Sequence, residues 1–346
     1  MCTNNEIKLG LQQEKGRKNE LSASDNVKNF FEDNRLYIEN CFDYYNEYEA
    51  NKADYIVQDC ESNVKKLQSM CMGKIILVIT ANPIEEGVLL HGLSDAATSK
   101  LGFFIIGNFP YHVCTIGEYT IVHTHAPRTG VEMTRRAINA ATKHIEPTAI
   151  VLLGICYGLD FNKYQLGDVL IASTLKNFRL NFRDSDSSEE TIFEAEVEDS
   201  FGVSTKPRVE LQSGVNVKLR YRNIFSIIRD ERGSLRNIKW ADGTMLSANC
   251  LMSSKKVKMA VLDAFGNVRP KPLGGEMEGG GLLNSEILEK GFDNWIVMKS
   301  ICDWGEKKNS LSSDPETSAK MKDAIQAMAM VHSWSVFYEM IKQRVF

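Results

Sequence analysis

The sequence predicts an α/β protein whose central sheet carries helices on both faces. Continuous apolar runs, such as 75–79, 149–153 and 295–298, are typical of strands buried on both faces. These runs alternate with longer stretches of helical periodicity, which is the pattern of an α/β fold. With 346 residues, the chain is long enough for one large domain and an extension.

Composition and charge exclude several classes of protein. No apolar run approaches the roughly 18 residues of a membrane span, and the first residues do not resemble a signal peptide. We therefore expect a cytoplasmic protein without a membrane partner. The eight cysteines are scattered and form no CxxC pair, which favours free thiols over a zinc site.

The net charge of −4 is concentrated near the N-terminus. Residues 1–70 hold nine Lys/Arg and thirteen Asp/Glu, so the remainder of the chain is neutral. A neutral main body lacks the basic surface with which proteins neutralise phosphates, and we expect no nucleic-acid partner.

Residues 1–72 are predicted to form a helical N-terminal extension. Ser24 and Asp25 suit a helix N-cap, and apolar residues then recur at helical spacing. We expect a helical hairpin with an acidic outer face. It packs on the main body, or it binds a protein partner through residues 24–70, and both interpretations stay open.

Residues 73–346 are predicted to form the main domain, with an insertion at about 178–245. That insertion contains an acidic run followed by a basic run at 206–239, with nine basic and three acidic residues. Elsewhere strands and helices alternate. The strands are expected at 74–80, 103–106, 119–122, 148–153, 168–172 and 295–300, and helices at 87 onwards, 132–144 and 317–344.

Ligands of open α/β sheets bind at the carboxyl ends of the strands. Acids or glycines follow three predicted strands, namely Glu85 with Glu86, the segment 154–158, and Asp303. The glycine-rich stretch 274–281 is the fourth candidate. There we expect Gly274 and Gly275 to make a turn and Glu276 and Glu278 to supply carboxylates.

Several catalytic motifs are missing from the sequence. It has no GxxxxGK[ST], GxSxG or HExxH, and the segment 154–158 is not GxGxxG. His123 and His125 share one face of a strand, but no third ligand lies nearby in the sequence. We therefore expect histidines that pack or face solvent, and neither a metal nor an organic cofactor.

The motifs taken in order resemble the nucleoside phosphorylase/nucleosidase superfamily, in particular methylthioadenosine/S-adenosylhomocysteine nucleosidases and the related nucleosidase domains of bacterial and fungal defence proteins. The resemblance covers roughly residues 73–178 and 243–344. It is carried by TANPIEE from Thr80, GICYGL from Gly154, QLGDVLI from Gln165, LSAN from Leu246, GEMEG from Gly275 and SICD from Ser300.

The resemblance implies a mixed, barrel-like central sheet wrapped by helices, a catalytic domain and a homo-oligomer. It also implies a site for a purine nucleoside or nucleotide. Asp303 would protonate the base, and Glu85 or Glu86 would activate water. The implied substrate-binding residues are Glu276, Met277, Glu278, Gly154, Cys156, Tyr157, Gly158, Leu251 and Met252. Leu251 stands where the family has an aromatic residue.

The chemistry of these residues suits cleavage of an N-glycosidic bond. The departing base needs a proton, the oxocarbenium-like sugar needs a nearby carboxylate, and the attacking water needs a base. Phosphorolytic relatives carry an arginine and a serine where this chain has Leu152 and Ile155, which favours water as the nucleophile. Arg128, near Gly130, could still bind an anion, so phosphorolysis stays an alternative. The third alternative is a protein that senses a purine ligand without cleaving it.

The predicted insertion bears on the substrate. Arg179 and Arg183 follow a strand and precede the basic run. The hypothesis is that they hold 5′-phosphates, so that the substrate is a nucleotide. A solvated basic surface paired with the acidic run is the other interpretation.

Overall fold

A computed structural model of the chain describes residues 22–51, 63–184, 191–203, 217–218, 237–248, 252, 254–265, 271–306 and 311–346. The strands are β1 (Lys74–Thr80), β2 (Gly102–Ile106), β3 (Phe109–Ile116), β4 (Tyr119–His125), β5 (Ala149–Gly158), β6 (Val169–Asp184), β7 (Thr191–Val203), β8 (Val217–Lys218), β9 (Asn237–Ile238), β10 (Trp240–Ala248), β11 (Gly274–Glu276) and β12 (Trp295–Asp303). The helices are α2 (Ala23–Asp33), α3 (Arg35–Ala50), α4 (Asn63–Met70), α5 (Pro83–Ala96), α6 (Val131–Thr142), α8 (Lys255–Ala264), α9 (Gly279–Leu283), α10 (Glu286–Glu289) and α11 (Pro315–Lys342).

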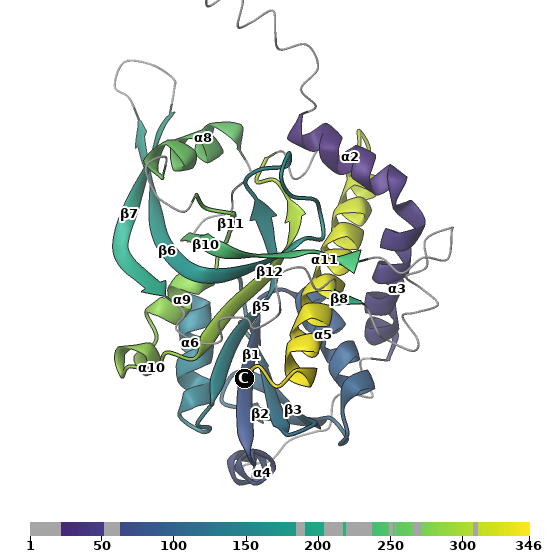
Figure 1. The fold of residues 1–346 in the computed structure, drawn as a ribbon, viewed down its shortest axis with the longest axis vertical. Helices are drawn as coiled ribbons and strands as arrows, with labels where there is room; N and C mark the ends of the chain where they lie inside the picture. The colour runs from purple at the N-terminus through teal and green to yellow at the C-terminus, as the bar shows by residue number, and fades with distance from the viewer. Residues whose placement is uncertain are drawn as a thin grey trace, which may run out of the picture.

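The predicted mixed, barrel-like sheet is confirmed. Its strands follow the order β11-β10-β6-β12-β5-β1-β4-β3-β2, and β11 also pairs with β5. This last pairing closes β5, β11, β10, β6 and β12 into a ring, while β1 to β4 extend the sheet outward (Figure 1). β1, β5 and β12 are parallel neighbours, so their carboxyl ends lie at one edge.

The core strands are built from the continuous apolar runs seen in the sequence. β1 is buried from Ile75 to Thr80, and the residues of β12 are buried from Trp295 to Cys302. Helices α3, α5 and α11 pack together on one side of the sheet, and α6 and α9 lie on the other (Figure 1). Both faces of the central strands are therefore covered, as their apolar composition requires.

The predicted N-terminal helices are present and dock on the main body. Helix α3 packs against α5 and α11. The Tyr37 hydroxyl contacts Nε2 of His332, and the Trp304 indole donates to Oδ1 of Asn26 at 2.9 Å. Residues 52–62, which belong to the predicted helical hairpin, lie outside the described residues. In the described part of the chain, no helix has the length and apolarity needed to cross a membrane.

The structure corrects three strand predictions. β5 does not end at Leu153 but continues through Gly158, and β4 continues past Val122 to His125. β3 was not predicted at all, because Pro110 and His112 interrupt its apolar pattern.

The boundaries of the predicted insertion also overlap the central sheet. β6 continues to Asp184, well past the predicted end at 172, and β10 begins at Trp240. These two strands pair in parallel over nine residue pairs, from Trp240 opposite Val169 to Ala248 opposite Phe178. Both ends of the 178–245 range therefore contain strands of the main sheet.

Candidate active site

The first turn of α5 holds the Glu85 carboxylate at the end of β1. The Asn82 side chain caps the helix by accepting from the Glu85 amide at 2.9 Å. In return, Oε2 of Glu85 accepts from the amides of Ala81 at 2.7 Å and Asn82 at 3.3 Å. This reciprocal capping box turns the carboxylate back over the helix N-terminus, where the helix dipole favours negative charge.

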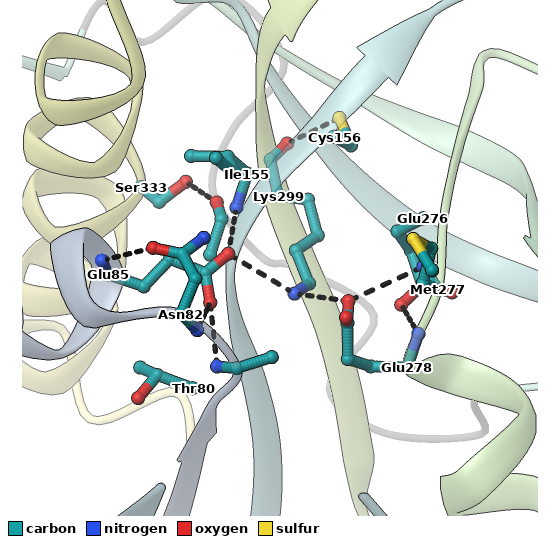
Figure 2. A network of polar contacts seen from close by, with 12 residues as sticks. Thr80, Asn82, Glu85, Ile155, Cys156, Glu276, Met277, Glu278, Lys299 and Ser333 are labelled. Atoms are coloured by element: carbon teal, nitrogen blue, oxygen red, sulfur yellow. Dashed lines mark hydrogen bonds and ion pairs between the residues drawn. The ribbon is translucent and has the colours of Figure 1, made fainter. Parts of the chain in front are cut away.

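The other oxygen of Glu85 reaches the neighbouring strands. Oε1 accepts from the Ile155 amide at 2.8 Å and lies 3.7 Å from Nζ of Lys299 (Figure 2). The residue is only 2% exposed. Burial raises the pKa of Glu85, while the Lys299 ammonium and the backbone donors lower it, and the net shift is upward. Such a carboxyl is poised to exchange protons nearer to neutral pH than an ordinary glutamate.

Lys299 lies between two glutamates and links them. Its ammonium is 3.0 Å from Oε2 of Glu278 and 1% of the residue is exposed (Figure 2). Burial lowers the pKa of Lys299, but the carboxylates of Glu278, Glu85 and Glu276 outweigh it and raise the pKa. Sequence reasoning missed this residue. The available signal was a lysine directly after the apolar run 295–298, in a strand predicted to be buried.

The glycine-rich stretch does not begin with the predicted turn. Gly274 and Gly275 lie in β11, which pairs with β10 and β5. A Cβ would lie 2.4 Å from the Tyr157 carbonyl oxygen at Gly274 and 2.1 Å from the Tyr157 hydroxyl at Gly275. The glycines are therefore needed for close strand approach, and not for a turn.

The Glu276 carboxylate organises the backbone that carries Met277 and Glu278. Its Oε2 accepts from the amides of Glu278 at 2.7 Å and Gly279 at 2.8 Å. Glu276 is buried, and burial together with the nearby Glu278 raises its pKa to about 7. Its hydrogen bonds thus hold the loop amides and the Ser247 side chain of β10, whereas Glu278 faces Lys299.

The glycine segment after Leu153 makes room for this cluster. Lys299 lies directly opposite Gly154 in the register of β12 and β5. A Cβ on Gly154 would lie 2.1 Å from Oε1 of Glu85 and 2.8 Å from Nζ of Lys299. The thiol of Cys156 lies 3.6 Å from the Lys299 carbonyl oxygen. The missing side chain at position 154 is what lets the two charged groups meet.

Asp303 lies at the end of β12 and is half-buried. It pairs with Tyr157 of β5, which in turn pairs with Gly275 of β11, so three neighbouring strands bring these residues to one edge. Its Oδ1 accepts from the Gly305 amide at 2.7 Å. A cavity of about 20 Å³ beside Asp303 is lined by residues that include Val27 and Ile325. It has room for a water molecule.

The structure separates the two acids of α5 that the sequence left as alternatives. Glu85 belongs to the cluster with Lys299 and Glu278, whereas Glu86 lies beside His112 and His123. Met252 is buried, and the side chains of Arg179 and Arg183 in β6, like all of Leu251, lie outside the described residues. The suggested roles of these residues stay predictions.

Gly154→Ala is expected to disrupt the cluster. The new methyl group overlaps Glu85 and Lys299, whose ends are fixed by hydrogen bonds, so overpacking should cost about 1–3 kcal/mol of unfolding free energy. The measurement is urea unfolding beside Gly243→Ala, where the added Cβ meets a Leu273 methyl at 2.9 Å, an apolar end that can rotate away. Equal losses in the two variants would contradict this account.

Glu276 should make the protein less stable as the pH rises. The pKa of Glu276 is about 7 in the folded protein, against an ordinary value of 4.5. The protonated carboxyl therefore contributes its full stabilisation of the fold below pH 4.5, and this stabilisation is lost as the pH rises through 7. Between these values the free energy of unfolding should fall by up to ~1.4 kcal/mol per pH unit. Urea unfolding at several pH values should show a flatter profile for Glu276→Gln, but not for Glu286→Gln on exposed α10. An unchanged slope in Glu276→Gln would refute the assignment.

Known nucleosidases are similar to this chain in sequence or in fold. No family profile matches the sequence. A death domain-containing ATP nucleosidase of Amphimedon queenslandica is 24% identical over 252 residues, which are 68% of this chain and 44% of that protein. The chain thus spans less than half the length of this relative.

Solved structures show the same fold. One is a 5′-methylthioadenosine/S-adenosylhomocysteine nucleosidase from Neisseria meningitidis in complex with methylthio-immucillin-A, with a TM-score of 0.53 and 14% sequence identity. The match covers 78% of this chain and 99% of the nucleosidase chain. Another is the futalosine hydrolase of Helicobacter pylori, with a TM-score of 0.50 and 15% sequence identity. This match covers 78% of this chain and 98% of the hydrolase chain. The predicted resemblance to the nucleoside phosphorylase/nucleosidase superfamily is confirmed, and at these identities the structural likeness establishes the fold.

Proposed function

We propose that this chain hydrolyses the N-glycosidic bond of a purine nucleoside or nucleotide and releases the free base. The observation that carries the proposal is the buried cluster of Glu85, Lys299 and Glu278, which lies beside the carboxyl end of β1 in a nucleosidase-like fold. Two carboxylates on one ammonium form an environment suited to a developing cationic sugar.

Glu85 is the proposed general base for the attacking water. Its raised pKa suits proton transfer near neutral pH, and the amides of Ala81 and Ile155 fix both of its oxygens. Lys299 contributes by keeping an opposite charge beside it. Of the two acids that follow β1, only Glu85 takes part in the described cluster, and we therefore assign the base to Glu85 rather than Glu86.

Glu278 and Met277 are the proposed contacts to the ribose. A carboxylate about 4 Å from an oxocarbenium-like carbon stabilises it by up to roughly 4 kcal/mol at an effective dielectric near 20. Asp303 is the proposed acid at the base, because it ends the strand that carries Lys299. Proton donation to the leaving base is the step that lets the bond break.

Water is favoured over phosphate as the nucleophile by the charge of the cluster. Glu85, Glu278 and Lys299 together carry one net negative charge, which repels a phosphate dianion. The two positions that bind phosphate in phosphorolytic relatives are equally unsuited here. Leu152 is fully buried and apolar, and Ile155 presents only its amide, which is already bonded to Glu85.

An adenine nucleotide is the proposed substrate. The name of the similar Amphimedon queenslandica protein, an ATP nucleosidase, suggests this class. Arg179 and Arg183 lie four residues apart in β6 and are the proposed partners of the 5′-phosphates. If they hold phosphates, Arg179→Ala combined with Arg183→Ala should lower nucleotide turnover and leave nucleoside turnover unchanged. An equal effect on both substrates would remove these residues from the proposal.

The direct test is chromatography of the products formed from adenosine, methylthioadenosine, AMP and ATP, each with and without phosphate. Free adenine together with ribose or a ribose phosphate, at a rate independent of phosphate, is the expected result. Ribose-1-phosphate that forms only with phosphate would show a phosphorylase. Ligand-induced thermal stabilisation without any free base would instead support a purine sensor.

The organisation of the chain completes the proposal. Residues 73–346 would form the catalytic domain, with residues 1–72 as a helical extension that docks on α5 and α11. A homo-oligomer and a protein partner that binds residues 24–70 stay part of the proposal. Light scattering of the full chain measures the oligomeric state.

A further inference from the structure

Three possible metal ligands from separate elements meet next to the candidate active site. His112 in β3 and His123 in β4 are directly opposite each other in an antiparallel pair, and Glu86 approaches from the first turn of α5. One ligand atom from each residue lies within 4.8 Å of the other two. In the sequence, His123 and His125 have no third ligand nearby, and only the fold brings His112 and Glu86 to His123.

The two histidines are spaced as a tetrahedral metal requires. Their Nδ1 atoms are 3.4 Å apart. Zinc–nitrogen bonds of about 2.0–2.1 Å at a tetrahedral angle place two nitrogens about 3.3–3.4 Å apart. The distance is long for a hydrogen bond between the rings, since N–H donors usually lie about 2.9–3.0 Å from their acceptors.

Both histidines are shielded from solvent. His112 is 4% exposed and His123 is fully buried. A metal binds a ring nitrogen that carries a lone pair, and the neutral form of each imidazole offers one such nitrogen.

The surroundings of His123 match those of a metal-bound histidine. Its other nitrogen, Nε2, lies 2.9 Å from the Thr80 hydroxyl. A metal-ligating histidine commonly donates its second N–H to an oxygen in this way, which fixes the tautomer and the orientation of the ring. With Nε2 as the donor to Thr80, Nδ1 is the nitrogen that accepts, and it faces His112.

We propose that Nδ1 of His112, Nδ1 of His123 and the carboxylate of Glu86 form a Zn²⁺ site, with a water molecule as the fourth ligand. Two imidazoles and one carboxylate are a common donor set for zinc with one open position. Glu86 is half-buried. Rotation about its side-chain bonds would bring a carboxylate oxygen to bonding distance. Its negative charge compensates part of the charge of the cation.

The site would connect the sheet to the helix that carries the proposed general base. Glu86 is adjacent to Glu85, and Thr80 immediately precedes Ala81, whose amide donates to Glu85. A bound metal would tie β3 and β4 to the first turn of α5 from the side opposite Lys299. We assign it a positioning role, because Glu86 and the histidines are outside the cluster that we place at the substrate.

The test is metal content of the full chain. Protein stripped with a chelator is dialysed against Zn²⁺, and bound zinc is measured together with the melting temperature. We expect one zinc per chain and, at 100 times the dissociation constant, a rise in Tm of roughly 3 °C or more. Co²⁺ in place of Zn²⁺ should give the visible absorption of a tetrahedral site.

Variants make the test specific. Glu86→Gln keeps the size of the side chain and should weaken zinc binding at least 10-fold, and His112→Ala should abolish it. His144→Ala, on a histidine outside the cluster, is the matched control and should bind zinc normally. Should His112→Ala fail to fold, the Glu86→Gln result still decides. Zinc binding that is absent, or that Glu86→Gln leaves unchanged, would overturn the proposal whether or not the chain proves to be a nucleosidase.

Discussion

Glu85→Gln should reduce the rate of base release by about 10²–10⁴-fold, the usual contribution of a general base. Glutamine keeps an oxygen for the Ile155 amide but cannot take a proton from water. The fold should persist, because the change also removes a buried charge rather than exposing one. Initial rates of adenine release from ATP, with circular dichroism as the check on folding, measure the effect.

The matched control for this variant is Glu316→Gln. Glu316 also lies in the first turn of a helix, but it is exposed and paired with Lys320 on the surface of α11. Its substitution should leave the rate unchanged. In the wild type, the rate should fall with decreasing pH through a pKa above 4.5, because burial raises the pKa of Glu85 and the base must be ionised. A Glu85→Gln variant with more than half of the wild-type rate would exclude Glu85 as the base.

Lys299→Met should destabilise the protein by about 3–5 kcal/mol, the usual cost of removing one partner from a buried charge cluster. Methionine fills a similar volume, so the loss reports charge rather than packing. Glu85 and Glu278 would then be left buried with one negative charge each and no cation between them. Urea unfolding at pH 7 measures the loss, and base release should fall in parallel.

Lys258→Met is the comparison for this loss. Lys258 is also buried and lies 3.1 Å from Glu306, but the side chain of that partner is 16% exposed and reaches water after the substitution. The destabilisation should therefore be clearly smaller. The double variant Glu85→Gln with Lys299→Met should regain part of the stability lost in Lys299→Met alone, because one uncompensated charge is gone. Two outcomes would contradict the coupling of these charges. One is an equal loss of unfolding free energy in Lys258→Met and Lys299→Met, and the other is a loss in the double variant equal to the sum of the two single losses.

Much of the fold could be predicted because its strands are locally unambiguous. β1 and β12 are continuous apolar runs, and such runs have few alternatives to a strand buried on both faces. β3 could not be predicted, since Pro110 and His112 break its pattern and the strand is stabilised by its pairing with β2 and β4. The ring of strands closed by β11 also depends on pairing partners that no local pattern reveals.

From the sequence, only the acidic residues of the candidate site could be predicted, and not their arrangement. Glu85 and Glu86 are adjacent and chemically alike, and both follow the same strand. The capping box of α5 turns Glu85 toward the sheet edge, while Glu86 meets the histidines of β3 and β4. Gly274 and Gly275 were expected in a turn because glycine permits turns, but their actual role is to admit Tyr157. Glycine can permit a turn or a close approach of neighbouring strands, and the sequence alone does not distinguish these two roles.

The sequence by itself determined the α/β class, the positions of the main strands and the acids that follow them, because burial and strand pattern are properties of neighbouring residues. Only the tertiary structure decided that Lys299 lies between Glu85 and Glu278. The physical reason is that two carboxylates can be buried together only when a cation reaches both of them. The register that sets Lys299 opposite Gly154 satisfies this condition, and it joins residues more than 140 positions apart.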